Sequence, residues 1–213
     1  MLNRKERKYY KKEELVKDGK LFYLFCEGEK TEIDYFYFFQ YHYALKINIQ
    51  IINNNGKNNP MGLYQNACEK LVKNPENQTP KYKFDDIDEV WFIIDTDTWG
   101  TQIQQLRQAA TNHNNWFVAQ SNRSFEVWLY YHFEQEKPTG EIQNWKNYLN
   151  EIIKGGFDAR KHTKLIETAI KNAKANFSDI SPLPDVHETQ VYELAEKILP
   201  FVKDDIDKLL TKT

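Results

Sequence analysis

The sequence predicts an α/β protein in which a mostly parallel sheet is covered by helices on both faces, followed by a helical C-terminal extension. Short apolar runs of strand length alternate with longer stretches of helical periodicity up to about Pro138. The apolar runs are nearly uninterrupted, as in strands that are buried on both faces. This alternation favours parallel strands, whose C-terminal ends line up at one edge of the sheet and form ligand sites there.

The length and composition fit one such domain. The chain has 213 residues, of which 40% are hydrophobic and 28% charged, which is enough to fill a core and typical of globular proteins. We expect a basic N-terminal segment over residues 1–20, the α/β domain over residues 21–137, and a helical extension over residues 138–213 that packs on it.

The first half of the domain begins with the apolar run of residues 21–26, which predicts a buried strand that ends at Glu27-Gly28. A helix is predicted over residues 31–45, where aromatic residues recur near helical spacing without Gly or Pro. Residues 47–52 then predict a second strand, and after an Asn-rich loop residues 63–72 predict a helix.

The second half contains the clearest strand, residues 90–94, which runs directly into Asp95-Thr96-Asp97. We predict a helix over residues 102–111, a short strand over residues 116–119, and a helix over residues 124–134. Beyond this point the strand signals fade. The extension is predicted to contain three helices separated by Gly and Pro residues, at residues 142–153, 161–176 and 188–210.

The sequence gives no sign of secretion or of a membrane span. Its two cysteines, Cys26 and Cys68, form no pattern typical of disulfide frameworks or zinc sites. The first twenty residues lack the apolar core of a signal peptide, and no run approaches the roughly 18 apolar residues that a membrane helix needs. We therefore expect a cytoplasmic protein that does not enter the membrane.

The formal charge of −2 provides no overall attraction for nucleic acid, so any attraction must come from local patches. One basic stretch near the N-terminus is interleaved with Tyr9 and Tyr10, and could either contact phosphates or form a solvated tail; it contains Arg4, Lys5, Arg7, Lys8, Lys11 and Lys12. For a second set we favour a solvated helix face, with Lys161 as a candidate substrate contact; this set is Arg160, Lys161, Lys164, Lys171 and Lys174.

Four carboxylates fall where the strands end or the next helix begins. Glu27 follows the first strand, Asp95 and Asp97 follow the central strand, and Glu126 follows the last strand. These positions can lie side by side at one edge of the sheet, where the carboxylates would repel one another without a cation. Oxygen ligands alone suit Mg²⁺ or Mn²⁺, and such a site can activate water for phosphodiester cleavage.

Each of these residues also has an ordinary structural explanation. Glu27-Gly28 could be a plain turn, Asp95 and Asp97 could cap the next helix, and Glu126 could be an exposed helix residue. Lys30 and Arg123 lie next to the acidic residues in sequence and could hold a phosphate or merely balance the acids. The combination of the four carboxylates is what favours a site.

The same residues carry a family resemblance. An apolar strand followed by Glu-Gly, and a later one followed by Asp-x-Asp, resemble the signature of the Toprim domain. Two longer motifs are similar to the RloB-like proteins, which are linked to restriction and phage-defence loci: Cys-Glu-Gly-Glu-Lys-Thr-Glu at residues 26–32 and Ser-Asn-Arg-Ser-Phe-Glu-Val-Trp-Leu-Tyr-Tyr-His-Phe at residues 121–133. A third stretch contains Thr189, Val191 and Leu194.

The resemblance implies a Toprim-like fold and a role for each carboxylate. Glu27 takes the place of the general acid or base, Asp95 and Asp97 that of the metal-binding pair, and Glu126 that of a glutamate that helps hold a second metal. One departure concerns Glu32: many Toprim domains place an acid one step earlier, so the role of Glu32 is left open.

We therefore predict a nuclease that uses Mg²⁺ or Mn²⁺, cleaves DNA or RNA, and acts in antiphage defence. A partner-gated or non-catalytic binding component of a defence system is the alternative, with a protein partner from the same locus. A haloacid dehalogenase-like phosphatase with Asp95 as nucleophile is less favoured, because Trp99 departs from its motif and Glu27 stays unused. The aromatic first helix makes a homo-oligomer possible.

Overall fold

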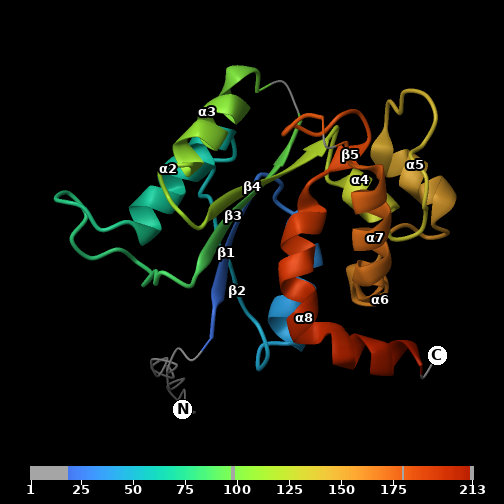
Figure 1. Ribbon diagram of the computed structural model, residues 1–213, viewed down its shortest axis with the longest axis horizontal. Helices are drawn as coiled ribbons and strands as arrows, with labels where there is room; N and C mark the ends of the chain where they lie inside the picture. The colour runs from blue at the N-terminus through green and yellow to red at the C-terminus, as the bar shows by residue number, and fades with distance from the viewer. Residues whose placement is uncertain (1–18, 97–98, 179, 212–213) are drawn as a thin grey trace, which may run out of the picture.

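A five-stranded sheet forms the centre of the computed structural model, which describes residues 19–96, 99–178 and 180–211 (Figure 1). The strand order is β2-β1-β3-β4-β5, with β5 antiparallel to β4 and the other neighbours parallel. Apart from residues 19 and 20, the basic N-terminal segment lies outside the described residues. The strands are β1 (Leu21–Cys26), β2 (Asn48–Ile51), β3 (Glu89–Asp95), β4 (Trp116–Asn122) and β5 (Glu188–Thr189).

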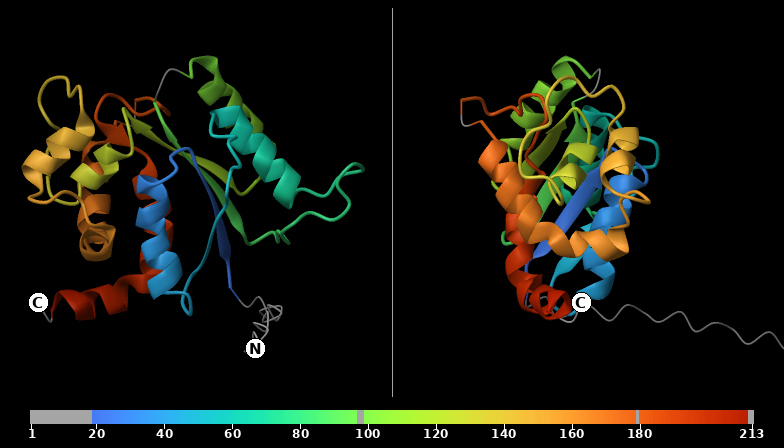
Figure 2. Two further views of the ribbon diagram at one scale, coloured as in Figure 1. Left: turned by 180° about the vertical axis from the view of Figure 1, so that it is seen from behind. Right: turned by 90° about the vertical axis from the view of Figure 1, so that its right-hand side faces the viewer.

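Helices cover both faces of the sheet, as the two views in Figure 2 show. One face carries α2 (Pro60–Leu71) and α3 (Thr101–Ala110). The other face carries six helices and the short 3₁₀ helix η1 (Thr163–Leu165). These six are α1 (Thr31–His42), α4 (Glu126–Tyr130), α5 (Trp145–Ile152), α6 (Ala159–His162), α7 (Ile166–Asn176) and α8 (Val191–Leu210).

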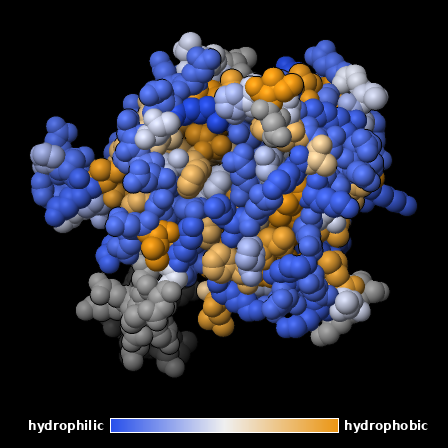
Figure 3. Space-filling model, in the orientation of Figure 1, coloured by the Kyte–Doolittle hydropathy of each residue, from blue (hydrophilic) through white to orange (hydrophobic). Residues whose placement is uncertain are grey.

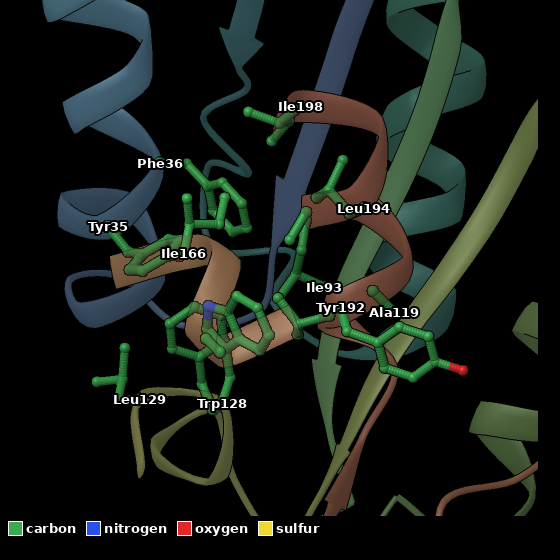
Figure 4. Close-up of a cluster of buried hydrophobic side chains, with 14 of the residues drawn as sticks. Tyr35, Phe36, Ile93, Ala119, Trp128, Leu129, Ile166, Tyr192, Leu194 and Ile198 are labelled. Atoms are coloured by element: carbon green, nitrogen blue, oxygen red, sulfur yellow. The ribbon is translucent and has the colours of Figure 1, made fainter. Parts of the chain in front are cut away.

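The side chains of the strands alternate between two apolar cores. On β1, Phe22, Leu24 and Cys26 pack into the core beneath α1, α4, α7 and α8, whereas Tyr23 and Phe25 pack beneath α2 and α3. Figure 4 shows the first core, in which Ile93 of β3 meets side chains from the helices on that face. This alternation explains why the strands read as continuous apolar runs: both of their faces are buried.

The α/β fold predicted from the sequence is confirmed, including the mostly parallel sheet and the helices on both faces. Each of the four predicted strands is present. The predicted helix over residues 124–134 is much shorter, because α4 spans only Glu126–Tyr130 and turns follow it. The expectation that strands stop before residue 138 is wrong, since β5 pairs with the end of β4 through Ser121 and Thr189.

The C-terminal half is part of the larger core. The buried stripe Leu194, Ile198 and Val202 of α8 faces α1 and the sheet, and all three side chains are fully buried. Polar residues cover most of the surface seen in Figure 3, with apolar patches between them. Within the described ranges, no helix is long and apolar enough to cross a membrane.

Candidate metal centre

Three of the predicted carboxylates converge at the C-terminal edge of the sheet. Glu27 directly follows β1, Asp95 is the last residue of β3, and Glu126 is the first residue of α4. Strands β1 and β3 are parallel neighbours, and the Glu27 backbone N–H donates to the Ile93 carbonyl over 2.9 Å. The parallel topology therefore brings together residues that lie almost 70 positions apart in the chain.

The Glu27 carboxylate joins the ends of both strands. Its Oε2 accepts a hydrogen bond from the Asp95 backbone N–H over 3.1 Å. Its Oε1 accepts one from the indole Nε1–H of Trp99 over 2.6 Å. Glu27 thus holds the end of β3 and the turn that follows it, a role for Trp99 that the sequence did not indicate.

Glu32 belongs to the same cluster. Its side chain is only 5% exposed, and its Oε1 accepts a hydrogen bond from the Gly28 backbone N–H over 3.1 Å. A Cβ atom at position 28 would lie 2.1 Å from Glu32 Oε2, so only glycine leaves room for the carboxylate. The structure therefore places Glu32 in the cluster, and the glycine four residues earlier was the available signal for that position.

The cluster is electrostatically strained. Burial raises the pKa of Asp95 well above its usual range, and the nearby carboxylates of Glu32, Glu27 and Glu126 raise it further. Burial is also the largest cause of the raised pKa of Glu32, with Glu126 and Glu27 adding to it. Asp95 and Glu32 are therefore each within electrostatic reach of both Glu27 and Glu126.

One oxygen in the cluster has no hydrogen-bond partner among the residues that the structure describes. Asp95 Oδ1 is buried and accepts no hydrogen bond from any residue that the structure describes. A buried carboxylate oxygen without a donor is costly, and a cation is the partner that would relieve both this cost and the repulsion. The orphaned oxygen is therefore the strongest sign that the cluster accommodates a positively charged ligand.

A surface cavity of about 300 Å³ opens over the cluster. It lies between the start of α1, the end of β3 and the start of α4, so it gives access to the carboxylates from solvent. The residues that line it are Gly28, Glu29, Lys30, Thr31, Glu32, Asp95, Phe125 and Glu126.

Of the three predicted substrate-binding cations, Lys30 lies at the cavity, whereas Arg123 and Lys161 lie outside its lining. Lys30 lines the cavity and donates to Asp34 over 3.0 Å. Arg123 lies 4.0 Å from Glu141, and Lys161 lies 3.6 Å from Asp158. Neither Arg123 nor Lys161 is among the described residues that line the cavity. All three cations are largely exposed, so their ion pairs contribute little free energy.

The donor set fits a hard divalent cation. The described candidates are all carboxylate oxygens, which suit Mg²⁺ or Mn²⁺. Asp97, the remaining predicted ligand, lies outside the described residues. In residues 19–96, 99–178 and 180–211, no group of three or more His, Cys, Asp or Glu side chains is arranged to hold a metal ion. The fit therefore rests on the donor chemistry and on the unpartnered Asp95 oxygen.

The comparisons with known proteins give one match. A family model described as RloB-like protein matches residues 22–198, which is most of the chain and includes every described member of the carboxylate cluster. No curated protein and no solved structure matches the chain.

Proposed function

Because this chain belongs to the RloB-like protein family, we propose that it is a metal-dependent nuclease that cleaves DNA or RNA in antiphage defence. The supporting observation is the buried carboxylate cluster around Asp95, whose Oδ1 has no partner among the described residues. We further propose that residues 21–137 form a Toprim-like unit that acts in the cytoplasm. The resemblance of the motifs around Glu27 and Asp95 to the Toprim signature supports this assignment.

In the proposed site, Asp95 and Asp97 would hold one or two Mg²⁺ or Mn²⁺ ions together with Glu126 and Glu32. Bound metal of this kind supplies an activated water and stabilises the leaving oxygen of a phosphodiester. Glu27 holds the Asp95 backbone through its Oε2, and we assign the transfer of a proton at the site to it. Glu32 enters this proposal because of its burial and its contact with Gly28.

Lys30 is the favoured contact for the substrate phosphate, because it lines the cavity and its pair with Asp34 is exposed. Arg123 and Lys161 are proposed to contact the nucleic acid outside the cavity. A partner protein from the same defence locus is the proposed restraint, because an unrestrained nuclease would damage its own cell.

A phosphatase with Asp95 as nucleophile is less well supported. Trp99 stands where the motif of that family has Thr or Val, and its indole donates to Glu27, which a phosphatase of that kind would leave unused. Such a mechanism would also give no role to Glu32 and Glu126, whose carboxyl groups lie near Asp95.

The test is a cleavage assay with plasmid DNA, single-stranded DNA, total RNA and tRNA, in Mg²⁺ or Mn²⁺ and in EDTA. We expect cleavage of one of these substrates that requires metal and is lost in Asp95→Asn, Glu27→Gln and Glu32→Gln. A matched control is Glu69→Gln, which removes an exposed carboxylate of α2 that pairs with Lys57 over 2.5 Å.

Cleavage by wild type and Glu69→Gln but by none of the cluster variants would support the proposal and identify the substrate. Cleavage that persists in Asp95→Asn would contradict it. If the wild-type protein is inactive on every substrate, both alone and with the products of its neighbouring genes, the protein is a binding component and the nuclease proposal fails.

A further inference from the structure

A hydrogen-bonded row of three polar side chains lies behind the carboxylate cluster, on the opposite face of the sheet. It consists of Arg107, Gln120 and Thr96. Successive residues of a strand point to opposite faces, and Ile93 and Ile94 accordingly belong to different cores. At the end of β3 the same alternation separates Asp95 from Thr96. Thr96 instead contacts Gln120 of β4, which neighbours the α3 face.

The hydrogen bonds that connect Arg107, Gln120 and Thr96 have a fixed donor-to-acceptor direction. Arg107 Nη2 of α3 donates to Gln120 Oε1 over 2.9 Å, and Gln120 Nε2 donates to Thr96 Oγ1 over 2.6 Å. A guanidinium can only donate, so it requires the carbonyl oxygen of the Gln120 amide to face it and thereby turns the NH₂ group toward Thr96. The Thr96 backbone N–H also donates to the Ser121 carbonyl over 2.8 Å, so two bonds anchor this residue to β4.

Arg107 is an unusual residue for this position. Burial lowers its pKa, and the nearby Glu193 only partly compensates. Its guanidinium also donates to Gln190, yet its Nε is buried without a hydrogen-bond partner in the described part of the chain. A half-buried charge whose donors are only partly satisfied is often less stabilising than an apolar side chain of similar volume. Stability alone therefore gives a weak explanation for Arg107.

We infer that Arg107 is a positioning residue for the metal site: through Gln120 and Thr96 it fixes the end of β3 and thereby the orientation of the Asp95 carboxylate. This inference rests on the proposed function. Asp95 is then held from two sides, by Glu27 at its backbone N–H and by the anchored Thr96 that follows it. Groups that orient a metal ligand typically change metal affinity by about 10- to 100-fold when they are removed.

The experiment measures Mn²⁺ binding by isothermal titration calorimetry in the wild-type protein, Thr96→Val and Arg107→Met, together with the thermal unfolding midpoint of each. Thr96→Val keeps the shape of the side chain and removes the acceptor of the Gln120 amide. We expect both variants to bind Mn²⁺ about tenfold more weakly than wild type. Thr96→Val should do so with little change in the unfolding midpoint.

The matched control is Gln190→Met, which removes another acceptor of Arg107 but leaves the link from Gln120 to Thr96 in place. A purely structural role of Arg107 predicts that this variant loses Mn²⁺ affinity along with the other two, whereas a positioning role predicts nearly wild-type affinity. Unchanged affinity in Thr96→Val, or equal loss in all three variants, overturns the inference. A wild-type protein that binds no Mn²⁺ overturns the proposed function, and the inference falls with it.

Discussion

At the scale of single residues, Asp95 concentrates the chemistry of the molecule. Its backbone N–H is bound by Glu27, its Oδ1 lacks a donor among the described residues, and three other carboxyl groups surround it. A folded protein without metal must tolerate this crowding. The crowding should therefore lower the free energy of unfolding of the metal-free protein, by an amount that depends on how many of these carboxyl groups are protonated.

Burial and neighbouring charges raise the pKa values of Asp95 and Glu32 above those of the unfolded chain. The folded protein therefore binds more protons than the unfolded one between the two sets of pKa values, so stability falls as the pH rises through this window. We expect metal-free Asp95→Asn to be more stable than wild type at pH 7, by an amount on the order of 1 kcal/mol. The difference should shrink at pH 4, where Asp95 of the folded wild type is protonated.

Urea unfolding in EDTA at both pH values measures this difference. Added Mg²⁺ should then stabilise the wild type more than Asp95→Asn, because a ligand that binds only the folded state raises its stability. A wild-type protein that is at least as stable as Asp95→Asn at pH 7 in EDTA would contradict the account of the cluster.

Gly28 provides a second test at this scale. The Cβ atom of Gly28→Ala would lie 2.1 Å from Glu32 Oε2, so the carboxylate must leave its place beside the Gly28 N–H. We expect metal-dependent cleavage to fall by about tenfold or more, as for other displaced metal-site groups. Gly62→Ala in α2 is the control: its Cβ would meet Asn59 Nδ2 at 3.1 Å, so it tests close packing on the other face of the sheet. Similar losses of activity in both variants would refute a specific role for Gly28.

At the scale of elements, the sequence predicted what depends on local pattern and missed what depends on distant contacts. Strands β1 and β3 are apolar on both faces, so the sequence predicts both strands and the acidic residues at their ends, Glu27 and Asp95. Strand β5 has only two residues and exists because Thr189 pairs with Ser121, a contact that no local pattern encodes. The sequence did not predict the place of Glu32 in the cluster for the same reason. The burial of its side chain depends on how α1 packs against the sheet and α4.

The packing of α8 predicts a strong and local effect on stability. Ile198 is fully buried in the larger core, whereas its neighbour Lys197 is exposed. Ile198→Ala should lower the free energy of unfolding by about 2–4 kcal/mol, because it removes buried methyl groups and leaves a cavity. Lys197→Ala should change it by less than about 0.5 kcal/mol. Chemical denaturation of both variants checks this, and equal effects would show that α8 contributes little to the core.

At the scale of the whole molecule, the charge distribution predicts that the proposed binding of nucleic acid requires metal. The formal charge is −2, and the proposed site is a cluster of carboxylates that repels phosphates. Bound divalent cations would offset much of this negative charge. Binding to a polyanion should therefore depend on metal far more than on the overall charge of the protein.

Fluorescence anisotropy with single-stranded DNA and RNA oligonucleotides tests this expectation. Affinity should be at least about tenfold higher in Ca²⁺, which occupies oxygen-ligand sites, than in EDTA, and should fall as the salt concentration rises. A chain without residues 1–18 isolates the contribution of the basic N-terminal segment. Equal affinity of that shortened chain in Ca²⁺ and EDTA would show that the cluster takes no part in binding.

The shortness of α4 also affects the point during synthesis at which the carboxylate cluster can be complete. This helix carries Glu126 but has only five residues, too few to be stable alone, and it packs against α5, α7 and β5. All three of these elements leave the ribosome after α4. A growing or prematurely terminated chain therefore contains Glu27 and Asp95 without a fixed Glu126. If the protein is the nuclease that we propose, chains whose synthesis stops before β5 cannot cleave nucleic acid, and only a polypeptide that includes β5 can do so.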